Sequence, residues 1–117
     1  MPSIIIADDN QGRRNLLGNN FERAGFQVTR TSTLRQTEAT ALATMPDVVL
    51  IDGEWESGDP IDSAQRMMTD SEFAFKSRIV LISRDTSNDV LVTSTKAGIN
   101  EVMAKPLDMD KLLSQVW

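Results

Sequence analysis

Residues 47–52 carry the sequence DVVLID, an apolar run that closes on the carboxylate of Asp52. Its apolar residues do not alternate with polar ones, so the run predicts a strand that is buried on both faces, as in a parallel sheet. Three similar runs are each followed directly by polar residues: 4–7 by Asp8 and Asp9, 79–82 by Ser83, and 101–104 by Lys105 and Pro106. These polar signals, the polar residues that directly follow or end an apolar run, therefore lie where buried strands are expected to end.

Helical patterns separate these apolar runs. In residues 11–24, Leu17, Phe21 and Ala24 fall at positions i, i+4 and i+7, and Gly25 follows where a C-terminal cap belongs. The expected helices are about 11–24, 33–44, 61–69, 86–97 and 108–116, and the expected strands are 3–7, 26–30, 47–51, 78–82 and 101–104. Residues 53–60 are expected to form a loop, and residues 70–77 a polar connection that contains Phe73 and Phe75.

Strand and helix thus alternate five times along the chain. This pattern predicts an α/β fold with a single doubly wound, five-stranded parallel sheet, helices on both faces and right-handed crossovers. Strand 26–30 ends in polar residues, so it is expected at an edge, and the 117 residues fit one domain, 1–117. The carboxyl ends of the strands then meet at one edge of the sheet, which gathers the polar signals into one pocket.

The composition excludes several classes of function. The chain has no cysteine and no histidine, which excludes thiol catalysis, a typical zinc site and a Ser-His-Asp triad. The net charge of −5 and the pI of about 4.6 oppose binding to nucleic acid or to an anionic membrane. Apolar runs of about five residues are far too short to span a membrane, and no signal peptide is visible. The cytoplasm is therefore the expected location.

Three carboxylates, one hydroxyl and one ammonium group in a single pocket suggest a magnesium-assisted phosphate site. Mg²⁺ prefers oxygen ligands, and carboxylates that lie close together need a cation to offset their repulsion. A carboxylate can also act as a nucleophile and carry a phosphoryl group as an acyl phosphate. Each residue alone has an ordinary explanation, such as a helix cap, a turn or a solvated lysine. Their joint occurrence at strand ends is what favours a site.

These residues, in this order, resemble the receiver domain of two-component response regulators, and the likeness extends from Ile4 to about Leu113. The resemblance implies a flavodoxin-like receiver fold with strand order 2-1-3-4-5. It also implies that the peptide bond between Lys105 and Pro106 is cis.

The resemblance further implies a role for each polar signal. Asp52 matches the phosphoacceptor, while Lys105 and Ser83 match the residues that bind the phosphoryl oxygens. A Mg²⁺ site, with Mn²⁺ as the alternative cation, would take its ligands from Asp9, Asp52, the main-chain carbonyl of Glu54 and, through water, Asp8.

A receiver of this kind takes its phosphoryl group from a phosphohistidine on a sensor histidine kinase or a histidine phosphotransfer protein. It catalyses its own phosphorylation but serves as a switch rather than as a metabolic enzyme. Residues of about 86–116 would then present an altered face to a downstream protein or an output domain. A homodimer through the last two helices is compatible with this function, whereas direct binding to nucleic acid or to a membrane is not expected.

Three features depart from the family pattern. The acidic stretch 55–63 is about three residues longer than usual, and Val102 stands where the family commonly has an aromatic switch residue. Arg84 replaces a small residue beside Ser83, and it is expected either to pair with Glu54 or Glu56 or to extend into solvent. Any switching would then run through Ser83, Arg84 and the segment that follows them.

Two alternatives stay open. One is a pseudo-receiver, which would act as a phosphorylation-independent protein-interaction module. The other is a small phosphatase or phosphotransferase that forms an aspartyl phosphate; that class usually has a general-acid Asp two residues beyond the nucleophile, where this chain has Glu54. Trp55, on the loop beside the expected pocket, is a candidate gate or fluorescent reporter.

Overall fold

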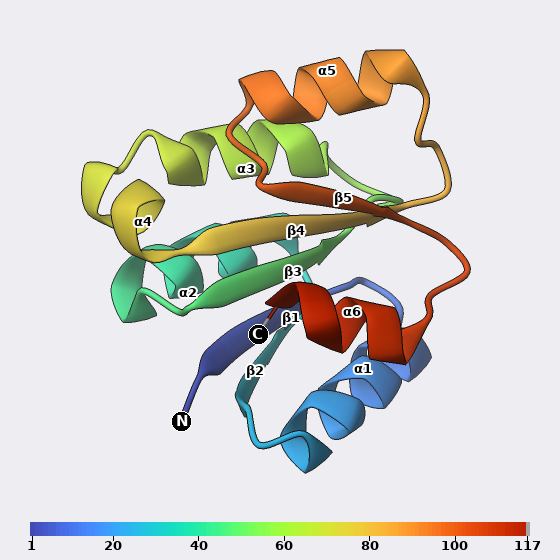
Figure 1. Ribbon diagram of the computed structural model, residues 1–117. Helices are drawn as coiled ribbons and strands as arrows, with labels where there is room; N and C mark the ends of the chain where they lie inside the picture. The colour runs from blue at the N-terminus through green and yellow to red at the C-terminus, as the bar shows by residue number, and fades with distance from the viewer. Residues whose placement is uncertain (117) are drawn as a thin grey trace.

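Five parallel strands form one sheet in the order β2-β1-β3-β4-β5, as the computed structural model of residues 1–116 shows (Figure 1). The strands are β1 Ser3–Ala7, β2 Gln27–Thr31, β3 Val48–Asp52, β4 Arg78–Ser83 and β5 Glu101–Ala104. The predicted order is confirmed, with the polar strand β2 at one edge. Trp117, which the expected domain 1–117 includes, lies outside the described residues.

Helices cover both faces of this sheet. They are α1 Gln11–Arg23, α2 Leu34–Thr44, α3 Pro60–Met68, α4 Ser71–Lys76, α5 Asn88–Lys96 and α6 Met109–Val116. Helices α1 and α6 lie together on one face, and α2 and α3 lie on the other (Figure 1). Within residues 1–116, no helix combines the length and the apolar character needed to cross a membrane.

The central strands are apolar throughout because both of their faces are buried. Alternate residues of one strand enter different cores: Ile4 and Ile6 pack with Leu17 and Phe21 of α1, whereas Ile5 packs in the opposite cluster. The same division holds along β3 and β4. This arrangement explains why the sequence shows continuous apolar runs rather than the alternation of a half-exposed strand.

Side-chain caps set the helix boundaries within one or two residues of the prediction. The Asn10 side chain accepts a hydrogen bond from the Arg13 N–H (2.9 Å) and starts α1, and Ser87 caps α5 through the N–H of Val90. At the other end of α1, Gly25 adopts φ 95°, a left-handed conformation that only glycine enters without a steric penalty.

Helix α4 lies where the sequence predicts only a polar connection over residues 70–77. Asp70 caps it by accepting a hydrogen bond from the N–H of Phe73 (3.0 Å), and the Phe73 ring is completely buried against the α2–α3 face. Six residues are too few to show a helical period in the sequence. One buried ring and one cap therefore hold a helix that the pattern of residues does not reveal.

Candidate functional site

The carboxyl ends of four neighbouring strands place the predicted residues at one edge of the sheet. Asp52 ends β3 and Ser83 ends β4, while Asp8 follows β1 and Lys105 follows β5. Because these strands are adjacent and parallel, their ends open to the same side of the molecule. The peptide bond between Lys105 and Pro106 is cis, as the resemblance implies.

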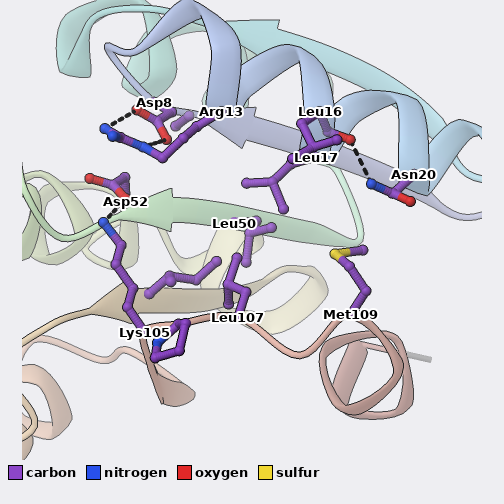
Figure 2. A pocket seen from close by; sticks show the side chains of 13 residues that line it. Asp8, Arg13, Leu16, Leu17, Asn20, Leu50, Asp52, Lys105, Leu107 and Met109 are labelled. Atoms are coloured by element: carbon purple, nitrogen blue, oxygen red, sulfur yellow. Dashed lines mark hydrogen bonds and ion pairs between the residues drawn. The ribbon is translucent and has the colours of Figure 1, made fainter.

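Asp52 and Lys105 form the centre of the site (Figure 2). The Asp52 residue is only 5% exposed, and its Oδ1 lies 2.7 Å from the Nζ of Lys105. Its Oδ2 accepts a hydrogen bond from the main-chain N–H of Glu54 (2.9 Å). Burial raises the pKa of Asp52, and the nearby Asp8 carboxylate adds to this rise, against the opposing effects of Lys105 and the Glu54 N–H. The surroundings of Asp52 therefore fix its carboxylate in place but destabilise its charged form, a property that is common among reactive groups in functional sites.

The ammonium group of Lys105 is shared between two carboxylates. Its Nζ also lies 2.7 Å from Oε1 of Glu54, so one cation bridges the end of β3 and the loop that follows. Burial of Lys105 favours its neutral form, but hydrogen bonds to Asp52 and Glu54 leave the pKa of the lysine raised. Burial likewise opposes the charge of Glu54, yet Lys105, the Arg84 N–H and Ser83 leave the pKa of Glu54 lowered. Both side chains thus stay charged at neutral pH.

The pairing of the Glu54 side chain with Lys105 is a role that the sequence does not indicate, since the expected partner of this side chain was Arg84. The main-chain N–H of Arg84 donates to Oε2 of Glu54 (3.4 Å), whereas its guanidinium makes one long contact, Nε to Oε1 at 4.0 Å, and the Arg84 side chain remains 76% exposed. Of the two outcomes expected for Arg84, the pairing with Glu54 is present but weak, and most of the side chain extends into solvent.

Asp8 is almost fully buried, and Arg13 binds its carboxylate with two hydrogen bonds (Figure 2). The guanidinium Nε donates to Oδ2 (3.0 Å) and Nη2 donates to Oδ1 (3.1 Å). The Oδ1 atom also accepts from the main-chain N–H of Asn10 (2.8 Å). The sequence reveals no role for Arg13. Its place in the first turn of α1, where side chains lean toward the helix N-terminus, is the signal that could have found it.

Asp9 faces the loop after β3 rather than the interior. Its Oδ2 accepts a hydrogen bond from the N–H of Glu56 (2.9 Å), and its Oδ1 lies 3.9 Å from Nη2 of Arg13. A depression of about 390 Å³ opens beside it, lined by Asp9, Asn10, Arg13, Glu54, Trp55 and Glu56. Carboxylate and carbonyl oxygens around an open, polar depression are the donors that a hard cation prefers.

The chemistry of these donors fits Mg²⁺, and the charges around Asp52 support the fit. The rise in the pKa of Asp52 comes in part from Asp8, so the two carboxylates repel each other and gain from a positive partner. In the described part of the chain, no three acidic residues are already arranged to hold a metal ion. Instead, Arg13 forms an ion pair with the buried carboxylate of Asp8, and Lys105 forms one with the buried carboxylate of Asp52.

Ser83 is buried at the end of β4 and is engaged with the turn that follows. Its Oγ donates to the Asp85 carbonyl (2.9 Å) and accepts from the Asp85 N–H (3.1 Å), and it lies 3.4 Å from Oε2 of Glu54. Asp85 in turn accepts at Oδ1 from the N–H of Ser87, the cap of α5 (2.9 Å). Ser83 is thus connected to the start of α5 through one short turn.

An apolar cavity of about 300 Å³ lies behind the site, between α1 and the segment that enters α6 (Figure 2). Leu17, Leu50, Leu107 and Met109 contribute to its walls, and Asp52, Lys105, Asp8 and Arg13 contribute the polar groups at one end. On the other face of the sheet, the ring of Trp55 packs against the core beneath α2 and α3, and its indole N–H donates to the main-chain carbonyl of Asp52. Trp55 is thus well placed as a reporter of the site.

Comparisons with known proteins find relatives along nearly the whole chain. The response regulator receiver domain family matches residues 4–117. Sporulation initiation phosphotransferase F of Bacillus subtilis is 28% identical over 113 residues, which cover 97% of this chain and 89% of that protein. The DNA-binding dual master transcriptional regulator RpaA of Synechocystis sp. is 26% identical over 116 residues, 99% of this chain, and the chain spans 48% of its length.

Solved structures agree on the fold. Chemotaxis protein CheY4 of Vibrio cholerae superposes with a TM-score of 0.92 at 20% identity, with 99% of this chain and 96% of that one covered. The flavodoxin-like receiver fold expected from the resemblance is therefore confirmed. By its matched sequence and its fold, this chain belongs to the response regulator receiver domain family.

Proposed function

We propose that this chain is a switch that takes a phosphoryl group onto Asp52 in a Mg²⁺-dependent reaction. Phosphorylation and dependence on Mg²⁺ are general to the receiver family. The observation that carries the proposal for this chain is the environment of Asp52: a buried carboxylate at the sheet edge, paired at 2.7 Å with the Lys105 ammonium and near enough to the Asp8 carboxylate for that charge to raise its pKa.

The proposed donor is a phosphohistidine on a sensor histidine kinase or a histidine phosphotransfer protein, as is general for receiver domains. The names of two relatives associate them with phosphoryl transfer, the sporulation initiation phosphotransferase of Bacillus subtilis and the autoinducer sensor kinase/phosphatase CqsS of Vibrio cholerae. A carboxylate oxygen of Asp52 bonds to phosphorus while the phosphorus–nitrogen bond breaks, and the leaving imidazole keeps its electron pair.

Each polar residue of the chain has a proposed part in this transfer. Lys105 leaves Asp52 and Glu54 to pair with a phosphoryl oxygen, and Ser83 donates its hydroxyl hydrogen to a second one. The carboxylates of Asp9 and Asp52 and the main-chain carbonyl of Glu54 would hold Mg²⁺, with Asp8 acting through water. The cation, when bound, offsets the negative charge of the carboxylates and of the incoming phosphoryl group.

The hydrogen bonds of Ser83 suggest how phosphorylation would be read out. The hydroxyl cannot donate to a phosphoryl oxygen and to the Asp85 carbonyl at once, so phosphorylation would remove one of the two hydrogen bonds between Ser83 and Asp85 and loosen the turn that leads to α5. A phosphoryl group that contacts Ser83 in only one of two arrangements of this turn shifts their populations. The affected face would include residues 86–116, which we propose as the surface for a downstream protein, an output domain or a second copy of the chain.

The phosphatase alternative is not favoured by the site. A general acid must be protonated before it acts, whereas the lowered pKa of Glu54 and its pairing with Lys105 keep this carboxyl ionised at neutral pH.

Labelling with acetyl phosphate tests the proposal. With Mg²⁺ present, the wild type is expected to gain one phosphoryl mass that hydroxylamine removes, and Asp52→Ala is expected to gain none. Asp89→Ala, a change at an exposed aspartate of α5, serves as the matched control and should label like the wild type. An unmodified wild type that also fails to bind a beryllium fluoride complex would refute the proposal in favour of a pseudo-receiver, which the matched relatives do not support.

A further inference from the structure

Arg13 is a cation in the acidic site to which the transfer above assigns no part. Its two hydrogen bonds engage both oxygens of the buried Asp8 carboxylate. The same guanidinium approaches Asp9 at 3.9 Å. It therefore lies between the two carboxylates that β1 brings to the sheet edge.

This position changes the charge of the site. Asp8, Asp9, Asp52 and Glu54 contribute four negative charges, and Lys105 and Arg13 contribute two positive ones, of which Arg13 alone binds Asp8. The pKa of Arg13 is raised, first by its hydrogen bond to Asp8 and also by the charges of Asp52 and Asp9, so all three carboxylates favour the cation at this place. A divalent ion that uses the same carboxylates meets a cation already bound there.

Arg14 supplies a natural comparison within the same turn of α1. Its Nη1 donates to the main-chain carbonyl of Asp8 (2.9 Å), so it supports the backbone without engaging the carboxylate. Arg13 and Arg14 carry the same charge but contact different groups of one residue, which separates the effect of occupying the carboxylate from a general effect of charge.

We propose that Arg13 is a tethered cation that competes with the divalent ion for the Asp8 carboxylate and thereby lowers the affinity of the site for Mg²⁺. The inference rests on the proposed function, because it concerns the same cation. In this role Arg13 takes no part in the phosphoryl transfer itself: loading of the site with Mg²⁺ requires the guanidinium to release or share Asp8.

An orienting role predicts the opposite result. A partner that only fixes a metal-binding carboxylate strengthens metal binding, and its removal weakens binding about 10-fold to 100-fold. Asp8 keeps a second anchor in the N–H of Asn10, so its carboxylate is expected to hold its place when Arg13 is replaced. The sign of the change in Mg²⁺ affinity therefore distinguishes competition from orientation.

Titration of Mg²⁺, followed by Trp55 fluorescence and by calorimetry, tests the proposal. Arg13→Met is expected to bind Mg²⁺ about tenfold more tightly than the wild type, because one positive charge leaves the carboxylates. Arg13→Gln keeps a neutral donor to Asp8 and should also tighten binding, whereas Arg13→Lys keeps the charge and should stay near the wild type. Arg14→Met is the matched control and should change affinity by less than about threefold, since its contact is to the main chain.

Two further measurements complete the test. In an Asp8→Asn background, Arg13→Met should tighten binding much less than it does in the wild type, because the carboxylate for which the two cations compete is gone and only the longer approach of Arg13 to Asp9 remains. Equal or weaker Mg²⁺ binding by both Arg13→Met and Arg13→Gln would overturn the inference. Acetyl phosphate labelling of the wild type is scored separately, so a normal adduct with unchanged affinities rejects the role of Arg13 alone, and a missing adduct rejects the proposed function.

Discussion

The residues of the site lie in a network in which each charge has a specific partner. Asp52 and Glu54 share the ammonium group of Lys105, and Asp8 holds the guanidinium of Arg13. Because one partner of each interaction, Asp8, Asp52 or Lys105, is largely buried, these interactions are less screened than those of surface pairs. Exchange of partners, rather than a large movement, is therefore the expected response to a phosphoryl group.

Replacing Lys105 by methionine should slow labelling of Asp52 by acetyl phosphate about 100-fold, since a positioned donor for the developing charge is lost. Lys111→Met, a change at an exposed lysine of α6, is the matched control and should label at the wild-type rate. The rate of adduct formation, measured by intact-mass spectrometry at saturating Mg²⁺, gives the comparison. Equal rates for the two variants would show that Lys105 does not assist the transfer.

Gly53, directly after Asp52, is required by close contact rather than by backbone conformation. A Cβ at this position would lie 2.9 Å from the main-chain oxygen of Ile82 and 3.0 Å from the Cβ of Ser83, so the ends of β3 and β4 would have to separate. Gly53→Ala is expected to lower the free energy of unfolding by about 1–3 kcal/mol.

Gly12→Ala is the control for this prediction. Gly12 lies in α1, and a Cβ added there would meet its nearest neighbour, Oδ1 of Asn10, at 3.4 Å, an ordinary contact distance. Alanine at this position should therefore stabilise the helix by about 0.5–1 kcal/mol. Urea unfolding of both variants measures the two changes. Changes of the same sign would contradict the role given to the contact at Gly53.

At the scale of elements, the sequence predicts the sheet better than its connections. The strands of both cores carry continuous apolar runs, and parallel pairing then fixes which ends meet, so Asp8, Asp52, Ser83 and Lys105 could be placed together without coordinates. The pairing of Arg13 with Asp8 could not be foreseen, because it depends on the angle at which α1 leaves β1. The ion pair between Glu54 and Lys105 could not be foreseen either, because it joins a loop to the end of a strand that is distant in the sequence.

Helix α4 was missed for a different reason, and its two aromatic residues test that reason. Phe73 is 0% exposed and Phe75 is 95% exposed, although both lie in the same six-residue helix. Phe73→Ala should cost about 3–5 kcal/mol of the free energy of unfolding, because it removes a buried ring and leaves a cavity. Phe75→Ala should change stability by less than about 0.5 kcal/mol. Similar losses in denaturant unfolding would show that burial of Phe73 does not hold α4.

For the whole molecule, the site has a cost in stability that depends on pH. Burial holds the pKa of Asp52 above its value in the unfolded chain, so the folded state binds this proton more tightly than the unfolded state does. The contribution of Asp52 to stability therefore decreases as the pH rises from the ordinary range of aspartate through the raised pKa, and the full penalty is present above it. The lowered pKa values of Glu38 and Glu54 act in the opposite direction, since their stabilisation is lost on acidification.

Comparison of Asp52→Asn with the wild type cancels the contributions of carboxyls remote from Asp52, such as Glu38, and reports the penalty at Asp52 together with its coupling to Asp8 and Lys105. At neutral pH the variant should be more stable by an amount on the order of 1 kcal/mol, because it removes a buried charge while Lys105 keeps Glu54 as its partner. The advantage should shrink as the pH falls toward the ordinary aspartate range, where the wild-type carboxyl is itself neutral. Asp89→Asn, on the exposed first turn of α5, should show no gain at any pH. Thermal unfolding across this pH range measures both differences, and an Asp52→Asn protein that is less stable than the wild type at neutral pH would mean that Lys105 stabilises the charge of Asp52 more than burial opposes it.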